Sequence, residues 1–346
     1  MKMNEPKINI GKGKIYRSNI KCTELEDGTP VIIPYFVMQG KRRRPILLLD
    51  AAIHGDELNG IEVIIRLFEE LNPMELNGTI LAVPVVNSLA FRERKRMDSI
   101  DGKDLNRVFP GKRNGTVTER IAYHFFNKFV KKADFGIDLH TGMKGHLLIP
   151  HPRLRAYNKI SPPIEYYRAI GTEIIFYHEG HPGMLNIAAE KEGIPIVCFE
   201  IGEAGRIDEY FINAGINGII NFMKYFNMLE GKPEIPEKQI LLKDYIEISS
   251  DIGGIFHPKV RAGDVIKKGR AIGIVKSPFT GEKRWVKAIK DGIIIGIRSQ
   301  PVVRPGTTVA WLMGFEQGNI LPSIKNIRGV ASKTFSATDK EGIKIR

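Results

Sequence analysis

The sequence contains few cysteines and no long apolar run. Only two of its 346 residues are cysteine, Cys22 and Cys198, and they form no CxxC pair. This pattern argues against a disulfide scaffold and favours a reducing compartment. No apolar stretch reaches the roughly 18 residues of a membrane-spanning helix, and the first residues lack the apolar core of a signal peptide. We therefore expect a cytoplasmic protein without a membrane partner.

Acidic side chains are outnumbered by basic ones. Lysine and arginine total 52 against 39 aspartates and glutamates, which gives a formal net charge of +13. Such an excess favours anionic partners. The basic residues are spread along the chain, however, and no signature of RNA or DNA binding accompanies them. We predict a small anionic substrate and no nucleic-acid partner, while a nucleic-acid binder remains an alternative that rests on charge alone.

The first two thirds of the chain alternate apolar runs with amphipathic segments. Residues 45–53 and 79–86 are apolar runs, and residues 59–71 between them repeat apolar positions at helical spacing. Strand, helix and strand in this order indicate a parallel crossover. Residues 143–165 contain four prolines and are expected to form a long loop. The pattern predicts an α/β domain over residues 1–235, with a mixed, mainly parallel sheet and helices on both faces.

A change of texture marks a second domain. Residues 231–238 are rich in proline and charge and suggest a linker. Short alternating runs punctuated by glycine follow, which is typical of an all-β module. We expect a C-terminal β domain over residues 236–346, and its last thirty or so residues are polar enough to form a loosely packed tail.

Three apolar runs end in titratable side chains. PILLLDAAIHGDELNG at residues 45–60 delivers His54 and Glu57, a second run ends at His140, and a third ends at Glu200. The carboxyl ends of parallel strands meet at one edge of a sheet, where α/β proteins bind ligands. Two imidazoles and one carboxylate are the ligand set of a catalytic zinc. The sequence thus predicts one Zn²⁺ per subunit, held by His54, Glu57 and His140.

The remaining chemistry is assigned to Glu200 and to the polar loop at residues 88–115. Glu200 is the candidate base that takes a proton from water. Arg96 or Arg107 of this loop can share the charge of an oxyanion, and Asn106 with Arg107 can clamp a substrate carboxylate. Taken singly these residues are ambiguous, because Glu200 alone could be half of a buried ion pair and a lone buried histidine is more often a core residue.

The motifs resemble those of the succinylglutamate desuccinylase/aspartoacylase family, a branch of the zinc-carboxypeptidase-like hydrolases. The resemblance covers roughly residues 45–206 and rests on five segments: HGDE (54–57), RMDSIDGKDLNRVFPG (96–111), GTVTERIA (115–122), DLHTG (138–142) and FEIGEAG (199–205). It implies a zinc hydrolase with the same roles, namely the three ligands, the base Glu200, the oxyanion-stabilising Arg96, and Asn106 with Arg107 as the carboxylate clamp.

Two further segments refine the resemblance. The spacer with Asp101-Gly102 and the segment GHLLIPHPR (145–153) resemble the bacterial and archaeal predicted-deacylase branch, and this implies that Arg153 touches the substrate. The C-terminal region resembles a barrel-sandwich hybrid, the shape of biotinyl and lipoyl domains. The lysine hairpin that carries a prosthetic group is not recognisable there, so covalent biotin or lipoate is not expected.

These observations predict a metal-dependent hydrolase that acts on linear amide C–N bonds. Its expected activity is the removal of an acyl group from an N-acyl amino acid or a related small amide through metal-activated water. A metallocarboxypeptidase acting on short or cell-wall peptides is the alternative, and a non-catalytic binding protein with a retained metal site is a third reading. The sequence does not identify the acyl group or the amine, and it leaves a homo-oligomer possible.

Overall fold

The computed structural model describes residues 5–243 and 245–314, which form two compact units. One unit comprises the described residues up to Thr141 together with Pro150–Leu242. The other comprises Gly142–Ile149 and the described residues from Lys243 onward. The roles predicted for residues 1–235 and 236–346 stay predictions, and the predicted polar tail lies outside the described residues.

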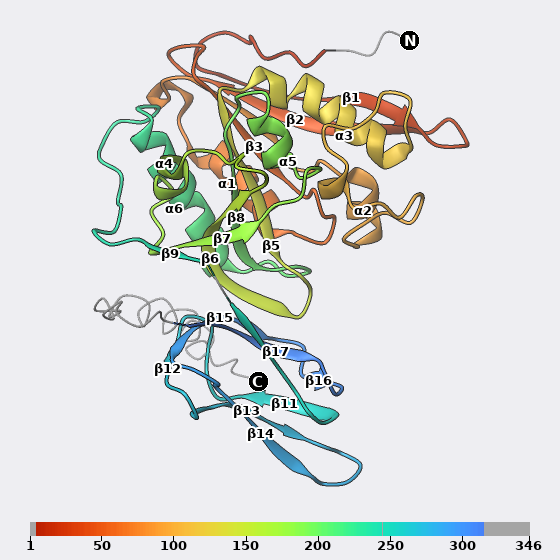
Figure 1. The fold of residues 1–346 in the computed structure, drawn as a ribbon. Helices are drawn as coiled ribbons and strands as arrows, with labels where there is room; N and C mark the ends of the chain where they lie inside the picture. Colours follow the sequence, from red (N-terminus) through yellow and green to blue (C-terminus); the bar gives the residue numbers. More distant parts are fainter. Residues whose placement is uncertain (1–4, 244, 315–346) are drawn as a thin grey trace, which may run out of the picture. The chain divides into compact units, whose positions relative to one another are not determined.

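A large sheet organises the first unit (Figure 1). Its strands follow the spatial order β1-β2-β4-β3-β5-β8-β6-β7-β9. In chain order they are β1 (Lys14–Glu24), β2 (Pro30–Gln39), β3 (Ile46–Ala51), β4 (Thr79–Val83), β5 (Phe135–Gly142), β6 (His146–Ala156), β7 (Ile174–Glu179), β8 (Ile196–Glu203) and β9 (Ile240–Leu242).

The sheet is mixed, as predicted, but it is not mainly parallel, which corrects that part of the prediction. Strand β3 pairs parallel with β4 and β5 as the crossover pattern predicts. By contrast, β1 pairs antiparallel with β2, and β2 pairs antiparallel with β4. The reason is local, because the Asp27-Gly28 turn, where Gly28 has φ +81°, closes a hairpin whose two arms must run in opposite directions.

Helices cover both faces of this sheet. The α-helices are α1 (Asn59–Glu70), α2 (Ser88–Glu93), α3 (Val117–Lys128), α4 (Ile164–Arg168), α5 (Leu185–Glu190) and α6 (Glu209–Tyr225), with short 3₁₀ turns at Pro73–Glu75, Leu105–Arg107 and Val130–Lys132. Ile46 and Leu48 of β3 belong to one buried cluster with residues of α3 and α5. Residues two apart on a strand share a face, so Ala51 points to the other face. There α1 approaches so closely that Gly60 lies against Ala51 and Leu139.

Residues 143–165 are not the long loop that their prolines suggested. They contain β6, the short helix α4 begins near their end, and only the stretch between these elements is irregular. Proline cannot donate a backbone hydrogen bond within a sheet. The pairing of β6 with β7 begins at Arg153, after Pro150 and Pro152, so these prolines lie outside that pairing. A strand therefore forms where composition alone predicts none.

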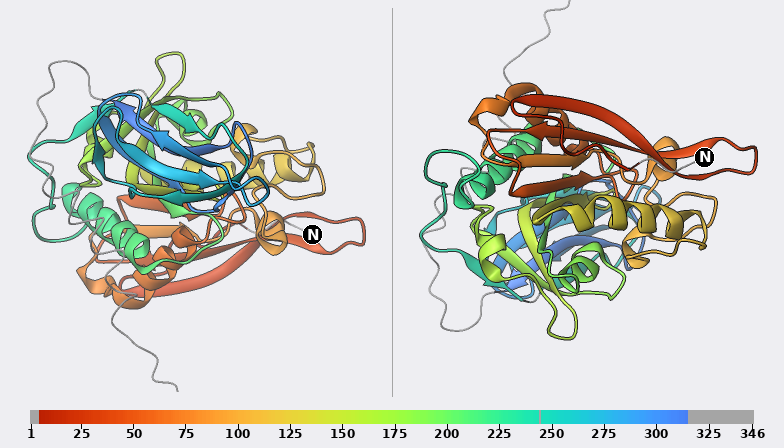
Figure 2. Two further views of the ribbon diagram at one scale, coloured as in Figure 1. Left: turned by 90° about the horizontal axis from the view of Figure 1, so that it is seen from below. Right: turned by 90° about the horizontal axis from the view of Figure 1, so that it is seen from above.

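The second unit contains only strands among its described elements (Figure 2). Besides the first residues of β6, they are β10 (Ile246–Ser249), β11 (Gly254–Pro258), β12 (Val265–Ile266), β13 (Ala271–Lys276), β14 (Lys283–Lys287), β15 (Gly292–Arg298), β16 (Val302–Val303) and β17 (Thr308–Gly314). Strand β15 pairs with β17 and β12, and the order β14-β13-β11-β16 makes a separate four-stranded sheet. Their inward side chains form a core of their own. No helix in the described ranges has both the length and the apolar character to cross a membrane.

The close approach of α1 to the sheet gives a test of the fold. A Cβ atom added at Gly60 would lie 2.7 Å from Leu139 Cβ and 3.0 Å from Ala51 Cβ. We expect Gly60→Ala to lower the free energy of unfolding by roughly 1–3 kcal/mol through overpacking, measured from the midpoint of urea denaturation. Glu69→Ala, at an exposed position of the same helix, is the control. Equal midpoints for the two variants would contradict this packing.

Candidate metal centre and active site

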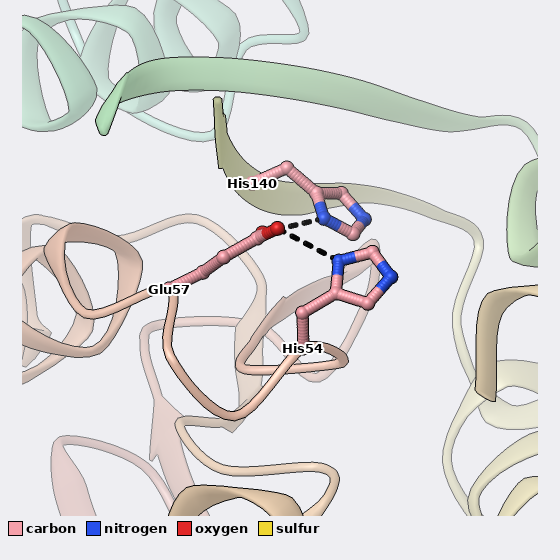
Figure 3. Close-up of side chains that lie close together, drawn as sticks. All are labelled: His54, Glu57 and His140. Carbon is pink, nitrogen blue, oxygen red and sulfur yellow. Dashed lines mark hydrogen bonds and ion pairs between the residues drawn. The ribbon is translucent and has the colours of Figure 1, made fainter. Parts of the chain in front are cut away.

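The ends of β3 and β5 bring three buried side chains together. These strands pair parallel and in register, with Asp50 opposite Asp138, so their carboxyl ends lie at one edge. His54 and Glu57 follow β3, and His140 stands near the end of β5. Figure 3 shows both imidazoles pointing at the Glu57 carboxylate. His54 Nδ1 lies 2.8 Å from Glu57 Oε1, and His140 Nδ1 lies 2.8 Å from Glu57 Oε2.

Gly55 allows the chain to bend between the first two of these residues. A Cβ atom on Gly55 would lie 2.0 Å from the carbonyl carbon of Ala90 and 2.1 Å from the backbone nitrogen of Phe91, both in α2. No other residue fits at this distance from the backbone of a helix. Gly55 is therefore required by the packing of α2 against the segment that carries His54 and Glu57.

Opposite charges compensate the burial of this group. Burial alone disfavours the ionised form of Glu57, but His54 and His140 outweigh it and hold the pKa of Glu57 below its usual range. Burial likewise opposes a charge on His140, while Asp138 and Glu57 raise the pKa of His140 well above its usual value. The Thr141 backbone N–H also donates to Glu57 Oε2 at 3.1 Å. The site thus favours the ionised form of the Glu57 carboxylate.

The second nitrogen of each imidazole faces another carboxylate. His54 Nε2 lies 3.2 Å from Asp104 Oδ1, and His140 Nε2 lies 2.9 Å from Asp138 Oδ2. A carboxylate on one ring nitrogen fixes the ring and leaves the other nitrogen for a metal, an arrangement common among metal-binding histidines. Here the other nitrogens are the two Nδ1 atoms, which converge on the Glu57 carboxylate. The donor set of His54, Glu57 and His140 therefore fits a divalent cation such as zinc.

A second combination of donors shares His140. Asp138, His140 and Cys198 also lie within mutual reach. Burial raises the pKa of the Cys198 thiol to about 11, so it stays protonated near neutral pH. The set with His54 and Glu57 is the better candidate, because two imidazoles and one carboxylate are a known ligand set of catalytic zinc.

Glu200 lies within β8, which continues beyond it to Glu203, and two arginines of β6 flank its carboxylate. Its Oε1 atom is 3.2 Å from Arg153 Nη1 and 3.4 Å from Arg155 Nη2. Its Oε2 atom is buried and has no hydrogen-bond partner among the described residues. Burial opposes ionisation, but Arg153, His140 and Arg155 together lower the pKa of Glu200. Glu200 is therefore ionised near neutral pH, with one oxygen held and the other available.

Arg96 and Arg107 come from the polar loop and meet at Asp104. Arg96 Nη2 lies 3.1 Å from Asp104 Oδ2, and its Nη1 lies 3.5 Å from Glu57 Oε1. The Arg107 side chain is 41% exposed and reaches Asp104 only at 4.0 Å. Partial burial and the positive charges of Arg155 and Arg96 lower the pKa of Arg107, against the opposing effect of Asp104. This mutual repulsion between arginines favours the binding of an anion.

Asn106 differs from its neighbour because it is buried. Its Oδ1 atom accepts a hydrogen bond from Leu185 N at 2.9 Å, and its Nδ2 atom lies 3.3 Å from His140 Nε2. The backbone of this loop is also fixed at Gly183, whose carbonyl accepts from Phe109 N and where a Cβ atom would lie 1.9 Å from Arg107 O. These contacts hold Arg107 in place from the side of α5.

Three charged residues of the site were missed in the sequence. Asp104 and Asp138 each touch an imidazole, and Arg155 holds Glu200. Asp138 could have been found, because it stands two residues before His140 in the same strand and so shares its face. Asp104 lies in the same motif as Asn106, but nothing local indicates its contact with His54. No sequence pattern around Arg155 indicates its contact with Glu200.

Comparison with known proteins points to one family. The model of the succinylglutamate desuccinylase/aspartoacylase catalytic domain matches residues 43–226. The chain is 28% identical over 291 residues to an N-alpha-acetyl-L-2,4-diaminobutyric acid deacetylase of Halomonas elongata, a match that covers 81% of this chain and 85% of the relative. It is 26% identical over 210 residues to a succinylglutamate desuccinylase of Pseudomonas fluorescens, covering 56% of this chain and 60% of the relative.

Solved structures have the same fold. A succinylglutamate desuccinylase from a Silicibacter species superposes with a TM-score of 0.78 at 25% identity, over 91% of this chain and 99% of that chain. The ectoine utilization protein of Ruegeria pomeroyi superposes with a TM-score of 0.76 at 24% identity, over 90% of this chain and 98% of that chain. At 24% identity, the similarity to the Ruegeria pomeroyi protein shows a shared fold and nothing more.

The donor set predicts how metal binding responds to substitution. We expect His54→Ala to lower the divalent metal content of the purified protein by at least about tenfold, because one ligand of three is lost. Elemental analysis measures this. A chelator should lower the melting temperature of the wild type, since a metal bound only to the folded state stabilises it, but not that of the variant. His178→Ala, a histidine outside the three residues, is the control, and equal metal loss in both variants would contradict the assignment.

Proposed function

The chain belongs to the succinylglutamate desuccinylase/aspartoacylase family, and on this premise we propose that it is a zinc-dependent amidohydrolase. It removes an acyl group from an N-acyl amino acid or a related small amide. The observation that carries the proposal is the convergence of His54, Glu57 and His140 at the sheet edge, with Glu200 close enough for His140 and Glu57 to influence its pKa. The family places the chain among hydrolases of amide bonds.

One zinc ion is assigned to His54, Glu57 and His140 in each chain. Support comes from the two Nδ1 atoms and the carboxylate that face one another, and from the carboxylates behind each ring. When bound there, zinc supplies a Lewis acid for the carbonyl group of the amide. The remaining steps fall to side chains of the protein.

Glu200 is assigned the role of the base. Its Oε2 atom has no hydrogen-bond partner among the residues that the structure describes, and it takes a proton from the attacking water. The water oxygen bonds to the carbonyl carbon, and the carbon–nitrogen bond then breaks. Glu200 returns the proton to the departing amine nitrogen, so the base is regenerated. The two arginines on Oε1 keep the carboxylate oriented through this exchange.

Arginines are assigned to the negative charges of the reaction. Arg96 lies against Glu57 with its side chain 31% exposed, so it can reach both the metal ligands and the substrate, and it stabilises the oxyanion. Arg107 presents an exposed guanidinium for the carboxylate of the amino acid. The buried contacts of Asn106 support a role in holding Arg107, while its predicted direct contact with substrate stays a prediction.

The cellular location and the chemical class of the substrate are further proposals. Both cysteines are free and buried, which fits the proposed cytoplasmic location. The names of the two curated relatives suggest acetyl and succinyl groups as the first acyl groups to examine. The positively charged arginine cluster supports a substrate that carries a carboxylate.

The proposed base can be tested by turnover. A screen of N-acetyl and N-succinyl amino acids, with short peptides as the competing substrates, should reveal release of a free amine from the N-acyl compounds. With the best substrate, we expect Glu200→Gln to keep its metal and to lower kcat by roughly 100-fold to 10,000-fold, as for the loss of a general base.

Glu203→Gln is the matched control, because Glu203 is also a buried carboxylate on β8. It should change kcat little. Turnover of peptides but not of N-acyl amino acids would favour the metallocarboxypeptidase, and retained turnover in Glu200→Gln would remove the base assignment.

The arginine pair on Glu200 predicts a shift in pH dependence. Each cation lowers the pKa of Glu200, so its removal raises that pKa, and a higher pH is then needed to ionise the base. We expect the acidic limb of the kcat/KM profile to move to higher pH in both Arg153→Met and Arg155→Met. Only Arg153→Met should also raise KM, because the Arg153 side chain is 21% exposed and that of Arg155 is 9% exposed.

Steady-state kinetics across pH measures both effects. Arg168→Met, on α4, is the control for loss of a positive charge elsewhere in the same unit. An unchanged acidic limb in both variants would show that the arginines do not act through Glu200.

A further inference from the structure

A hollow in the first unit lies between β1 and α3, which pack side by side (Figures 1 and 2). Its volume is about 220 Å³. None of its residues belongs to the candidate active site. The lining residues are Lys21, Cys22, Thr23 and Glu24 at the end of β1, Arg113 and Asn114 in the loop before α3, and Arg120 and His124 on α3.

The charge of this hollow is positive and uncompensated. Lys21 is neutralised by Glu24. Arg113 has no hydrogen bond or ion pair with any described residue. Arg120 donates from Nε to Gly115 O at 2.9 Å and forms no ion pair with the part of the chain that the structure describes. Two guanidinium groups therefore have N–H donors without an acceptor in the described part of the chain.

His124 gives an independent indication at the same place. The residue is only 3% exposed, and its Nδ1 atom has no hydrogen-bond partner among the described residues. Buried polar atoms are nearly always hydrogen-bonded, so this exception indicates a binding partner that the described residues do not supply. Burial together with Lys128, Arg113 and Arg120 lowers the pKa of His124 to about 4, which reports the positive potential at the ring.

We propose that this hollow binds a small oxyanion, a phosphate or a carboxylate group, held by Arg113, Arg120 and His124. An oxyanion accepts hydrogen bonds from both guanidinium groups and from a ring N–H, and it balances the charge that they share. The volume is below the roughly 300–1,000 Å³ of pockets for drug-sized ligands, so it suits a small ion or the end group of a larger molecule. A merely solvated basic surface would explain the two arginines but not the buried imidazole.

Nuclear magnetic resonance of the full, metal-loaded chain tests this proposal. Histidines labelled at Cε1 are observed, and His124→Gln identifies the His124 signal. Sodium phosphate and sodium succinate are added in separate titrations, with sodium chloride at matched ionic strength as the reference. We expect a saturable shift of the His124 signal with at least one of the two anions, and the anion that produces it identifies the source of the oxyanion.

Matched variants separate a built site from general charge effects. The double variant Arg113→Gln/Arg120→Gln should weaken the apparent affinity by at least about tenfold. Lys132→Gln, which removes an exposed charge outside the hollow, should leave it unchanged. The single variant Arg113→Gln, at an exposed position, repeats the test if the double variant is unstable. The proposal is overturned if neither anion gives a saturable shift, if chloride gives the same shift, or if the arginine variants bind as the wild type does.

Discussion

The contact of one buried carboxylate with two imidazoles is the interaction on which the rest of this structure depends. Glu57 is 2% exposed, and burying an unpaired carboxylate costs several kcal/mol. The cost is offset only if His54 and His140 arrive at the same point, which requires β3 and β5 to lie parallel and in register. A slip of one residue in β5 would turn His140 to the opposite face of the sheet. The register of the central strands and the electrostatics of the site therefore constrain each other.

The sequence contains enough information to find this centre. His54, His140 and Glu200 each follow an apolar run, and parallel strands of this kind deliver their carboxyl ends to one edge. The structure does bring His54, Glu57 and His140 into contact. The family expected from the motifs is confirmed by the match over residues 43–226. These predictions succeed because each rests on a local pattern, an apolar strand followed by a polar residue, whose position in space is fixed by strand direction alone.

What the sequence did not provide depends on contacts between distant residues. Asp104 meets His54 across 50 residues, and Arg155 meets Glu200 across 45 residues. No periodicity encodes such pairs. The prediction of a mainly parallel sheet was wrong for a related reason. An apolar run indicates a buried strand, but it does not indicate whether that strand pairs parallel or antiparallel with its neighbours. The long loop expected at residues 143–165 was wrong because prolines exclude a strand only where they interrupt its pairing. In β6, Pro150 and Pro152 come before the residues that pair with β7.

Strand β6 also bears on substrate specificity. Arg153 and Arg155 stand two residues apart on β6, so both point to the same face, and both hold the same oxygen of Glu200. If Glu200 is the base, as proposed, then β6 sets the direction of its free oxygen and also supplies positive charge for an anionic substrate. A substitution that relaxes the demand for a negatively charged substrate would also change the orientation and the pKa of the base. Substrate charge and base strength are in this way coupled through one strand, and a change in either must be compensated in the other.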